Sequence, residues 1–185
     1  MEYRAREVDL ERNRMKKLTI TASVLAGMFS GMVSAVDVNF KGSLVIPDCV
    51  VNNNTALTVD FSEVEIQTMT SANTPFHVKS FDVALNCPYI VGLPKLTLTS
   101  SAVHNATLGV IQTSKYSEGL VIYLRQKDGT TPVPLGTATN VSTSVTGSGT
   151  SRTLRLNAGV GWVKNMSDLT AGPFTGSAGL QVRYE

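Results

Sequence analysis

Apolar and polar residues alternate along residues 36–46, VDVNFKGSLVI. The even positions form an apolar row that includes one glycine: Val36, Val38, Phe40, Gly42, Leu44 and Ile46. Because successive side chains of a β-strand point to opposite faces, this period of two predicts a strand with one apolar face. The missing side chain at Gly42 is typical of a bulge or of a close approach by another backbone. Two interpretations follow: an ordinary first strand of its own domain, or an arm that supplies its apolar row to another molecule.

Similar short alternating runs recur through the rest of the chain. They cover residues 56–61, 76–87, 95–99, 108–112, 119–125, 152–160 and 174–184, separated by turn-forming Asn, Pro, Gly and Asp residues. The Gly- and Ser-rich residues 141–151 are predicted to form an exposed loop or a frayed edge. Seven or more short strands without a convincing helical period predict one all-β domain, an antiparallel sandwich of immunoglobulin-like proportions.

A secretory leader precedes these runs. Met15-Lys16-Lys17 begins it, residues 18–33 are apolar, and Val33-Ser34-Ala35 supplies the small residues of a cleavage site. This pattern favours a signal peptide over a membrane anchor, with cleavage between Ala35 and Val36. Residues 1–14 do not fit a leader and are interpreted as an upstream extension. The expected organisation is therefore residues 1–14 extension, 15–35 signal peptide, 36–46 arm and 47–185 β-domain.

Charge and cysteine content narrow the class of protein further. The chain has 16 Lys+Arg and 14 Asp+Glu, of which six and four lie in residues 1–35, so the remainder carries ten of each. A balanced, scattered charge argues against binding to nucleic acid or to an anionic membrane. In a secreted chain, Cys49 and Cys87 favour one disulfide, whose 38-residue separation should stabilise the fold by about 4 kcal/mol. A metal site is a poor alternative, since His77 and His104 lack ligand spacing.

Candidate catalytic groups are sparse, and no metal or cofactor is expected. Glu63 and Glu65 share one face of their run and resemble paired carboxylates, but a solvated strand edge explains them better. His77 and His104 are interpreted as surface residues. Trp162, the only tryptophan, is more consistent with a core aromatic than with a sugar-stacking platform. An enzyme is therefore the least favoured class.

The sequence resembles the pilus subunits that Gram-negative bacteria assemble by the chaperone–usher pathway, most closely those of the P-pilus tip fibrillum. The likeness covers residues 36–185. It rests on FKGSLVIPDC (40–49), VEIQT (64–68), NCPY (86–89), GLVIYL (119–124), PLGT (134–137) and AGPFTGSAGLQVRYE (171–185). The most specific part is the C-terminal motif, in which a glycine fourteen residues from the end precedes alternating apolar residues and a penultimate tyrosine. Gly172, Ala178, Leu180, Val182 and Tyr184 match it.

The resemblance implies a specific fold and function. The fold would be an immunoglobulin-like sandwich that lacks its last strand, with a groove beside its C-terminal strand. A periplasmic chaperone would fill the groove first, and the arm of the next subunit would replace it at an outer-membrane usher. Residues 36–46 would then be the donor strand. The groove and the surface read by chaperone and usher would include Gly172, Phe174, Ala178, Leu180, Val182 and Tyr184.

The partners and location follow from the same resemblance. The chain would be a structural subunit of an adhesive pilus on the bacterial surface, exported through the periplasm, without cofactor or nucleic acid. Its partners would be the chaperone, the usher and neighbouring subunits. The alternative is a single-domain adhesin that binds a host glycan or matrix protein, for example through residues 141–151 or around Trp162.

Overall fold

The computed structural model describes residues 36–185. The predicted extension, signal peptide and cleavage position at Ala35 lie outside the described residues. The chain divides between Ser43 and Leu44 into two units, and each is described by itself. Among the described residues, no helix has the length and apolarity needed to cross a membrane.

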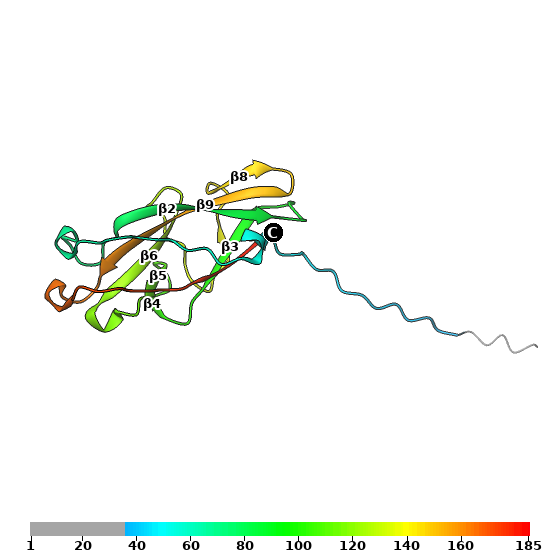
Figure 1. Ribbon diagram of the computed structural model, residues 1–185. Helices are drawn as coiled ribbons and strands as arrows, with labels where there is room; N and C mark the ends of the chain where they lie inside the picture. Colours follow the sequence, from blue (N-terminus) through cyan, green and yellow to red (C-terminus); the bar gives the residue numbers. More distant parts are fainter. Residues whose placement is uncertain (1–35) are drawn as a thin grey trace, which may run out of the picture. The chain divides into compact units, whose positions relative to one another are not determined.

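Residues 44–185 form a β-domain with ten strands and four single-turn 3₁₀ helices (Figure 1). The strands are β1 (Val50–Val51), β2 (Phe76–Asn86), β3 (Pro94–Thr99), β4 (Val103–Asn105), β5 (Val110–Gln112), β6 (Leu120–Gln126), β7 (Thr139–Asn140), β8 (Val145–Ser148), β9 (Ser151–Trp162) and β10 (Gly179–Tyr184). The helical turns are η1 (Asn52–Asn54), η2 (Ile66–Thr68), η3 (Tyr116–Glu118) and η4 (Met166–Asp168). The prediction of an all-β domain is confirmed.

The strands form two antiparallel sheets. The larger has the order β1-β2-β9-β6-β5-β4, and β8 also pairs with β9. β8 uses the first part of β9, Ser151–Leu154, while β6 uses the second part, Leu156–Trp162. The smaller sheet has the order β10-β3-β7. The C-terminal strand therefore pairs with β3, in register from Gly179 opposite Thr99 to Tyr184 opposite Pro94.

The core lies between the two sheets and is built by the predicted alternation. The buried side chains come from alternate positions of β2, β3, β6, β9 and β10: Val83, Leu85, Leu96, Leu98, Leu120, Ile122, Leu124, Leu154, Leu156, Ala158, Val160, Val182 and Tyr184. The two cysteines also belong to this core and form the predicted disulfide, with 4.1 Å between their Cα atoms. It joins the start of the domain to the end of β2.

Two segments differ from the predicted elements, and a third takes one of its two predicted forms. Of the two forms predicted for residues 141–151, a loop or an edge, the structure has an edge: β8 pairs with β9, Val141 and Ser144 are buried, and most of the other residues are exposed. Residues 56–61 alternate but lie in no strand. Residues 36–46 also lie in no strand, so the first strand of the domain is β1. Alternation predicts a strand face, whereas a strand also needs a partner for its backbone groups, and neither of the last two segments has one within the described residues.

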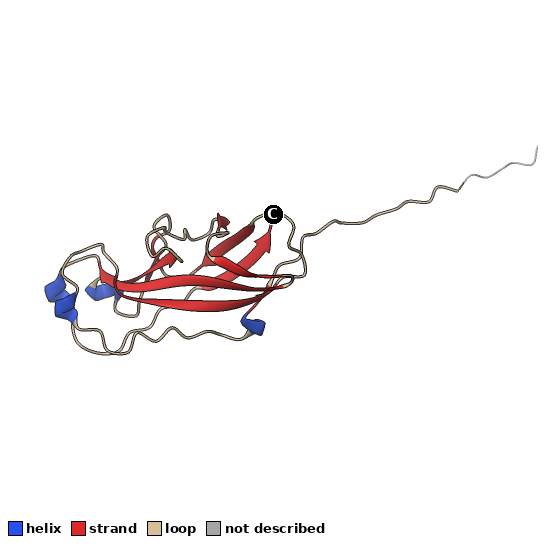
Figure 2. Cartoon of the chain, turned by 90° about the horizontal axis from the view of Figure 1, so that it is seen from above, coloured by secondary structure: helices blue, strands red, loops and turns tan. Residues whose placement is uncertain are grey.

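The two ends of the domain carry different elements. Figure 2 shows helical turns gathered at one end, whereas the C-terminus lies toward the other. η2, η3 and η4 form the first end, here called the helix end. The disulfide, the loop of residues 88–93 and Glu185 form the second, here called the arm-root end, because residues 44–49 leave the domain there.

Candidate functional site

Two long segments without a strand border an open cavity of about 1000 Å³. We call residues 57–67 the first rim, residues 169–176 the second rim, and the cavity between them the groove. Its floor is apolar, since Met69, Leu120 and Ile122 line it and are buried in the domain. In Figure 1 the rims are the blue-green and the red-brown tubes that run along the length of the domain. The groove therefore exposes part of the sandwich core between two unpaired backbones.

Apolar side chains of both rims continue this floor. Val59 and Val64 are half-buried and pack against the core, and Phe61 is buried. The Phe61 ring contacts the Phe174 ring of the second rim, with 6.1 Å between the centroids. Leu57 stays exposed. The alternation that predicted a strand at residues 56–61 is thus the apolar lining of one groove wall.

Hydrogen bonds near the helix end hold the first rim. The indole nitrogen of Trp162 donates to the carbonyl oxygen of Met69 at 2.8 Å, which gives the half-buried tryptophan a structural partner. The hydroxyl of Thr68 lies 2.5 Å from Nε2 of His77. His77 has φ of +49° at the register shift of β2, so its backbone conformation is strained for a non-glycine residue. These residues position the rim and do not form a catalytic cluster.

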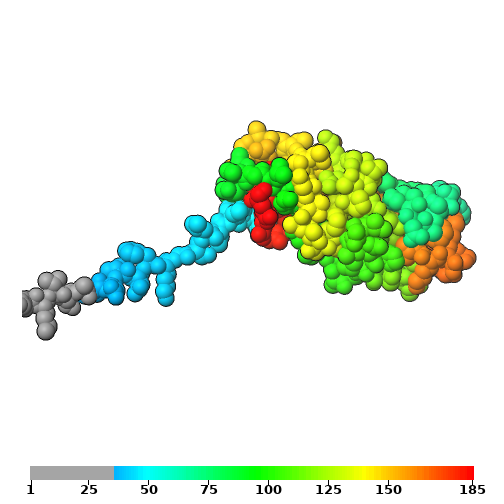
Figure 3. Space-filling model, turned by 180° about the vertical axis from the view of Figure 1, so that it is seen from behind, coloured from blue at the N-terminus to red at the C-terminus, as the bar shows by residue number. Residues whose placement is uncertain are grey.

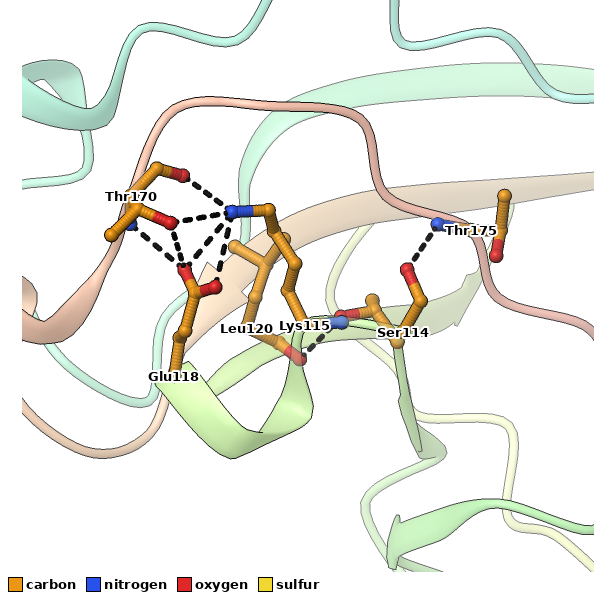
Figure 4. A network of polar contacts seen from close by, with 7 residues as sticks. Ser114, Lys115, Glu118, Leu120, Thr170 and Thr175 are labelled. Carbon is orange, nitrogen blue, oxygen red and sulfur yellow. Dashed lines mark hydrogen bonds and ion pairs between the residues drawn. The ribbon is translucent and has the colours of Figure 1, made fainter.

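A polar network holds the start of the second rim (Figure 4). Nζ of Lys115 donates to both carboxylate oxygens of Glu118 at 3.1 Å and to the carbonyl oxygen of Thr170 at 2.7 Å. The backbone N–H of Thr170 donates to Glu118 at 2.8 Å. Further along, the backbone N–H of Ser114 donates to the carbonyl oxygen of Thr175, and the N–H of Thr175 donates to the Ser114 hydroxyl. The second rim is therefore attached at its start and near its end.

The same network changes the acidity of its carboxylate. The pKa of Glu118 is lowered, chiefly because its charged form accepts the backbone N–H of Thr170 and also the ammonium group of Lys115. The Lys115 side chain is only 14% exposed, and its charge lies at the end of a groove whose floor is apolar and whose rims also carry polar residues. The lowered pKa keeps Glu118 ionised near neutral pH, where its carboxylate accepts the hydrogen bonds that hold the rim.

Two glycines allow the second rim to follow its path. Gly172 has φ of +138°, a conformation that favours glycine, and a Cβ there would lie 3.6 Å from Cε of Lys115. At Gly176 a Cβ would lie 2.9 Å from Cδ1 of Ile122. The rim backbone thus turns beside the Lys115 network at its start and rests directly on the floor at its end.

The C-terminal strand continues this edge beyond the groove. One edge of β10 pairs with β3, and on the other edge the carbonyl oxygen of Val182 accepts the N–H of Cys49 at 2.8 Å. Since the backbone groups of every second residue point to the same edge of a strand, Leu180 and Ala178 direct theirs to the side on which Cys49 lies. The edge that begins in the second rim is therefore continuous with the edge of β10.

Only some of the residues predicted to form the groove lie together in the structure. Gly172 and Phe174 line the groove, whereas Ala178 and Leu180 lie further along the same edge and are half-buried. Val182 and Tyr184 are buried in the core of the sandwich. Sequence reasoning missed the floor and the Lys115–Glu118–Thr170 network. Leu120 and Ile122 of the floor belong to a predicted core strand, and Met69 lies outside the predicted strands. The network joins residues 55 positions apart, so no local pattern marks the floor or the network.

The predicted donor residues are exposed. Phe40 is 90% exposed, Leu44 is fully exposed, and a Cβ at Gly42 would meet no atom within 4 Å. No described residue therefore packs against Gly42. Its role as a point of close approach stays a prediction.

A family model described as "Fimbrial protein" matches residues 38–185. The chain belongs to the fimbrial protein family. It is 33% identical to the fimbrial protein PrsE of Escherichia coli over 176 residues, which cover 92% of this chain and 98% of PrsE. It is 24% identical to the fimbrial adapter PapF of Escherichia coli over 177 residues, covering 92% and 99% of the two chains. As a family member, the chain is a structural pilus subunit displayed on the bacterial surface.

Solved structures agree with the fold. The crystal structure of the P pilus rod subunit PapA matches with a TM-score of 0.54 and 20% identity, over 80% of this chain and all of PapA. The structure of the adaptor subunit PapF matches with a TM-score of 0.50 and 20% identity, over 76% of this chain and 98% of that chain. The prediction of a pilin-type β-sandwich is confirmed.

Proposed function

We propose that this pilus subunit polymerises by donor-strand complementation. A periplasmic chaperone first inserts a strand into the groove, and at an outer-membrane usher the arm of another subunit replaces it. The arm of this chain, residues 36–46, enters the groove of a neighbour in the same way. The observation that carries this proposal is the groove with an apolar floor between two rims that lack strand partners.

Simple strand geometry supports the fit. The first rim runs from the arm-root end to the helix end, and the second rim returns, so a strand between them is parallel to one and antiparallel to the other. At about 3.3 Å per residue, the eleven residues of the arm extend over about 36 Å, the length of a long strand. Its apolar row would face the floor while its backbone pairs with the rims, the recognition mode of strand addition to a sheet.

The energetic consequence is a large dependence on the donor. Burying each large apolar side chain of the arm is worth about 1.5–3 kcal/mol as an upper bound, and a whole domain is stable by only about 5–15 kcal/mol. A subunit with an empty groove should therefore be marginal, and one with a filled groove should dissociate very slowly. The open edge is also an aggregation hazard, which explains the need for a chaperone.

We place the subunit in the tip fibrillum of the pilus. Support comes from the similarity to PrsE, to the minor fimbrial protein PrsF and to the fimbrial adapter PapF of Escherichia coli. The role is structural and not enzymatic. A single-domain adhesin is not favoured, because the similar proteins are named as fimbrial, minor fimbrial and adapter subunits.

Gly42→Arg tests the donor role, and Ser43→Arg is its matched control. Both add the same side chain to the arm, but the period of two places position 43 on the opposite, polar face. Gly42→Arg should leave chaperone capture unchanged and abolish incorporation of the subunit into pili, whereas Ser43→Arg should be incorporated. The measurement is the yield of subunit in sheared pili and in periplasmic chaperone complexes. Normal incorporation of Gly42→Arg would refute the proposal.

A further inference from the structure

One turn of the chain holds the second rim at two points. This turn, residues 113–118, precedes β6 and includes η3; we call it the clamp. At the first point, Nζ of Lys115 donates to the carbonyl oxygen of Thr170 at 2.7 Å and to its hydroxyl oxygen at 2.8 Å. At the second point, Ser114 and Thr175 exchange two hydrogen bonds, at 2.8 and 3.0 Å. The clamp therefore fixes the rim on both sides of its middle part.

The middle part of the second rim has an unpaired backbone. Within the described part of the chain, no hydrogen bond involves the backbone groups of residues 171–174. Three of these four residues are exposed, and only Phe174 packs against the core. A segment with so few contacts of its own opens easily unless its ends are held. Its position beside an empty groove therefore depends on the clamp.

Lys115 is itself fixed relative to the floor of the groove. Its side chain is 14% exposed and lines the groove, and its Nζ also donates to both carboxylate oxygens of Glu118 at 3.1 Å. Its backbone N–H donates to the hydroxyl of the buried Thr113 at 3.2 Å. That hydroxyl donates in turn to the carbonyl oxygen of Leu120, a floor residue, at 2.8 Å. The ammonium group thus binds the rim from a fixed position.

The first clamp point lies where the two rims meet. Figure 3 shows blue-green residues near position 70 beside orange residues near position 165 at the helix end of the domain. The first rim ends there and the second rim begins there. Among the described residues that line the groove, Lys115 is the only basic one. No second lysine or arginine of the described groove lining shares its task.

A strand adds more readily to an edge that is already in place, because ordering each backbone residue costs conformational entropy. We propose that Lys115 is a positioning residue for strand insertion. Through Thr170 it keeps residues 171–174 beside the empty groove, so that a donor strand meets a preformed edge. Lys115 holds the rim from the domain and not through the donor, so its main effect is on the rate at which a donor enters. This inference rests on the proposed strand exchange.

Lys115→Met tests this role, and Lys164→Met is its matched control. Methionine keeps most of the aliphatic stem and removes the ammonium group. Nζ of Lys164 donates to the carbonyl oxygen of Ser117 in the same clamp at 2.7 Å, but among the described residues no hydrogen bond joins it to the second rim. The parent recipient is the mature chain carrying Gly42→Arg, so that it accepts but does not donate. The donor is a labelled synthetic peptide of residues 36–48, whose association and dissociation rates are measured.

We expect the peptide to associate about tenfold more slowly with the Lys115→Met recipient than with the parent, while its dissociation rate changes by less than about twofold. Lys115→Arg, which restores a cationic donor, should recover most of the association rate. Lys164→Met should match the parent. An unchanged association rate for Lys115→Met would overturn the proposal. An equal loss for Lys164→Met would also overturn it, because the effect would then belong to the clamp as a whole.

Amide hydrogen exchange separates this inference from the strand exchange itself. Without peptide, the N–H of Thr170 should exchange faster in Lys115→Met than in the parent. The N–H of Leu124, which donates to the carbonyl oxygen of Gly109 in the large sheet, should not change. Equal exchange of Thr170 in both chains would overturn the proposal, as would faster exchange at both amides, which indicates general destabilisation. A parent that does not bind the peptide would instead refute strand exchange, and the positioning role with it.

Discussion

Strand β9 and the arm carry the same pattern and have opposite environments. In β9, Leu154, Leu156 and Val160 alternate with mostly polar residues and are buried between two paired strands. In residues 36–46 the apolar row is equally regular, yet Phe40 is almost fully exposed and no strand forms. The difference lies in the backbone partners. Alternation therefore specifies that a segment has an apolar strand face, but not which molecule covers it.

The first rim lies between these extremes. Its Phe61 is buried like a core residue, whereas Leu57 is exposed like the arm, and its backbone has no strand partner. The first rim thus packs a side chain into the core while its backbone pairs with no strand. This is the arrangement expected beside the position of a missing strand. The arm has the pattern of that missing strand.

The largest expected contrast is between core and arm truncations. Leu156→Ala should lower the free energy of unfolding by about 2–5 kcal/mol, because it leaves a cavity in the core. Phe40→Ala should change it by less than about 0.5 kcal/mol, as for other exposed positions. Denaturant unfolding of the mature chain, with its groove filled by the peptide of residues 36–48, measures both. A loss of several kcal/mol for Phe40→Ala would show that the arm packs on its own domain.

Substituting a glycine of the second rim and a glycine of the arm should give a smaller difference in stability. Gly172→Ala should destabilise the domain by about 1–2 kcal/mol, because φ of +138° is strained for alanine. Gly42→Ala should leave unfolding unchanged, since a Cβ there meets nothing, yet it should weaken insertion into a recipient groove. Thermal unfolding and the dissociation rate of donor–recipient pairs measure the two properties separately. If Gly42→Ala donates as well as the wild type, the groove does not approach the arm closely at that position.

The smallest effect concerns pH and the second rim. The pKa of Glu118 is lowered in the folded chain, so its contribution to stability is present above its ordinary value near 4.5 and is lost as pH falls through the lower, folded value. Glu118→Gln should therefore destabilise the domain at pH 7, and the difference from wild type should shrink in acid below about pH 4.5. Glu63→Gln, on the other rim, is the control. A loss of stability in Glu118→Gln that does not change with pH would contradict the view that ionised Glu118 holds the second rim.

Much of the fold was predictable, because local patterns determine it. The alternation of residues 76–87, 95–99, 119–125 and 152–160 predicted the core strands, and two cysteines in a secreted chain predicted the disulfide. Residues 141–151 were predicted to be an exposed loop or a frayed edge, and they form the mostly exposed edge strand β8, which pairs with β9. Tertiary pairing overrides composition at such edges.

The groove was only partly predictable. The C-terminal motif pointed to Gly172 and Phe174, which line it, but the same pattern also selected Val182 and Tyr184, which are buried. Period two identifies the inward face of a strand and does not distinguish covered from uncovered stretches of that face. The Lys115–Glu118–Thr170 network depends on contacts between distant residues, so only the fold reveals it.

The central claim is that the domain lacks one strand and that a segment with the sequence of residues 36–46 completes it. Equilibrium unfolding of the mature Gly42→Arg chain, with and without saturating peptide of residues 36–48, tests this most directly. We predict a marginally stable chain alone and a rise in unfolding free energy of several kcal/mol with the peptide. A chain that is fully stable alone, with an unfolding free energy that the peptide does not change, would contradict the account.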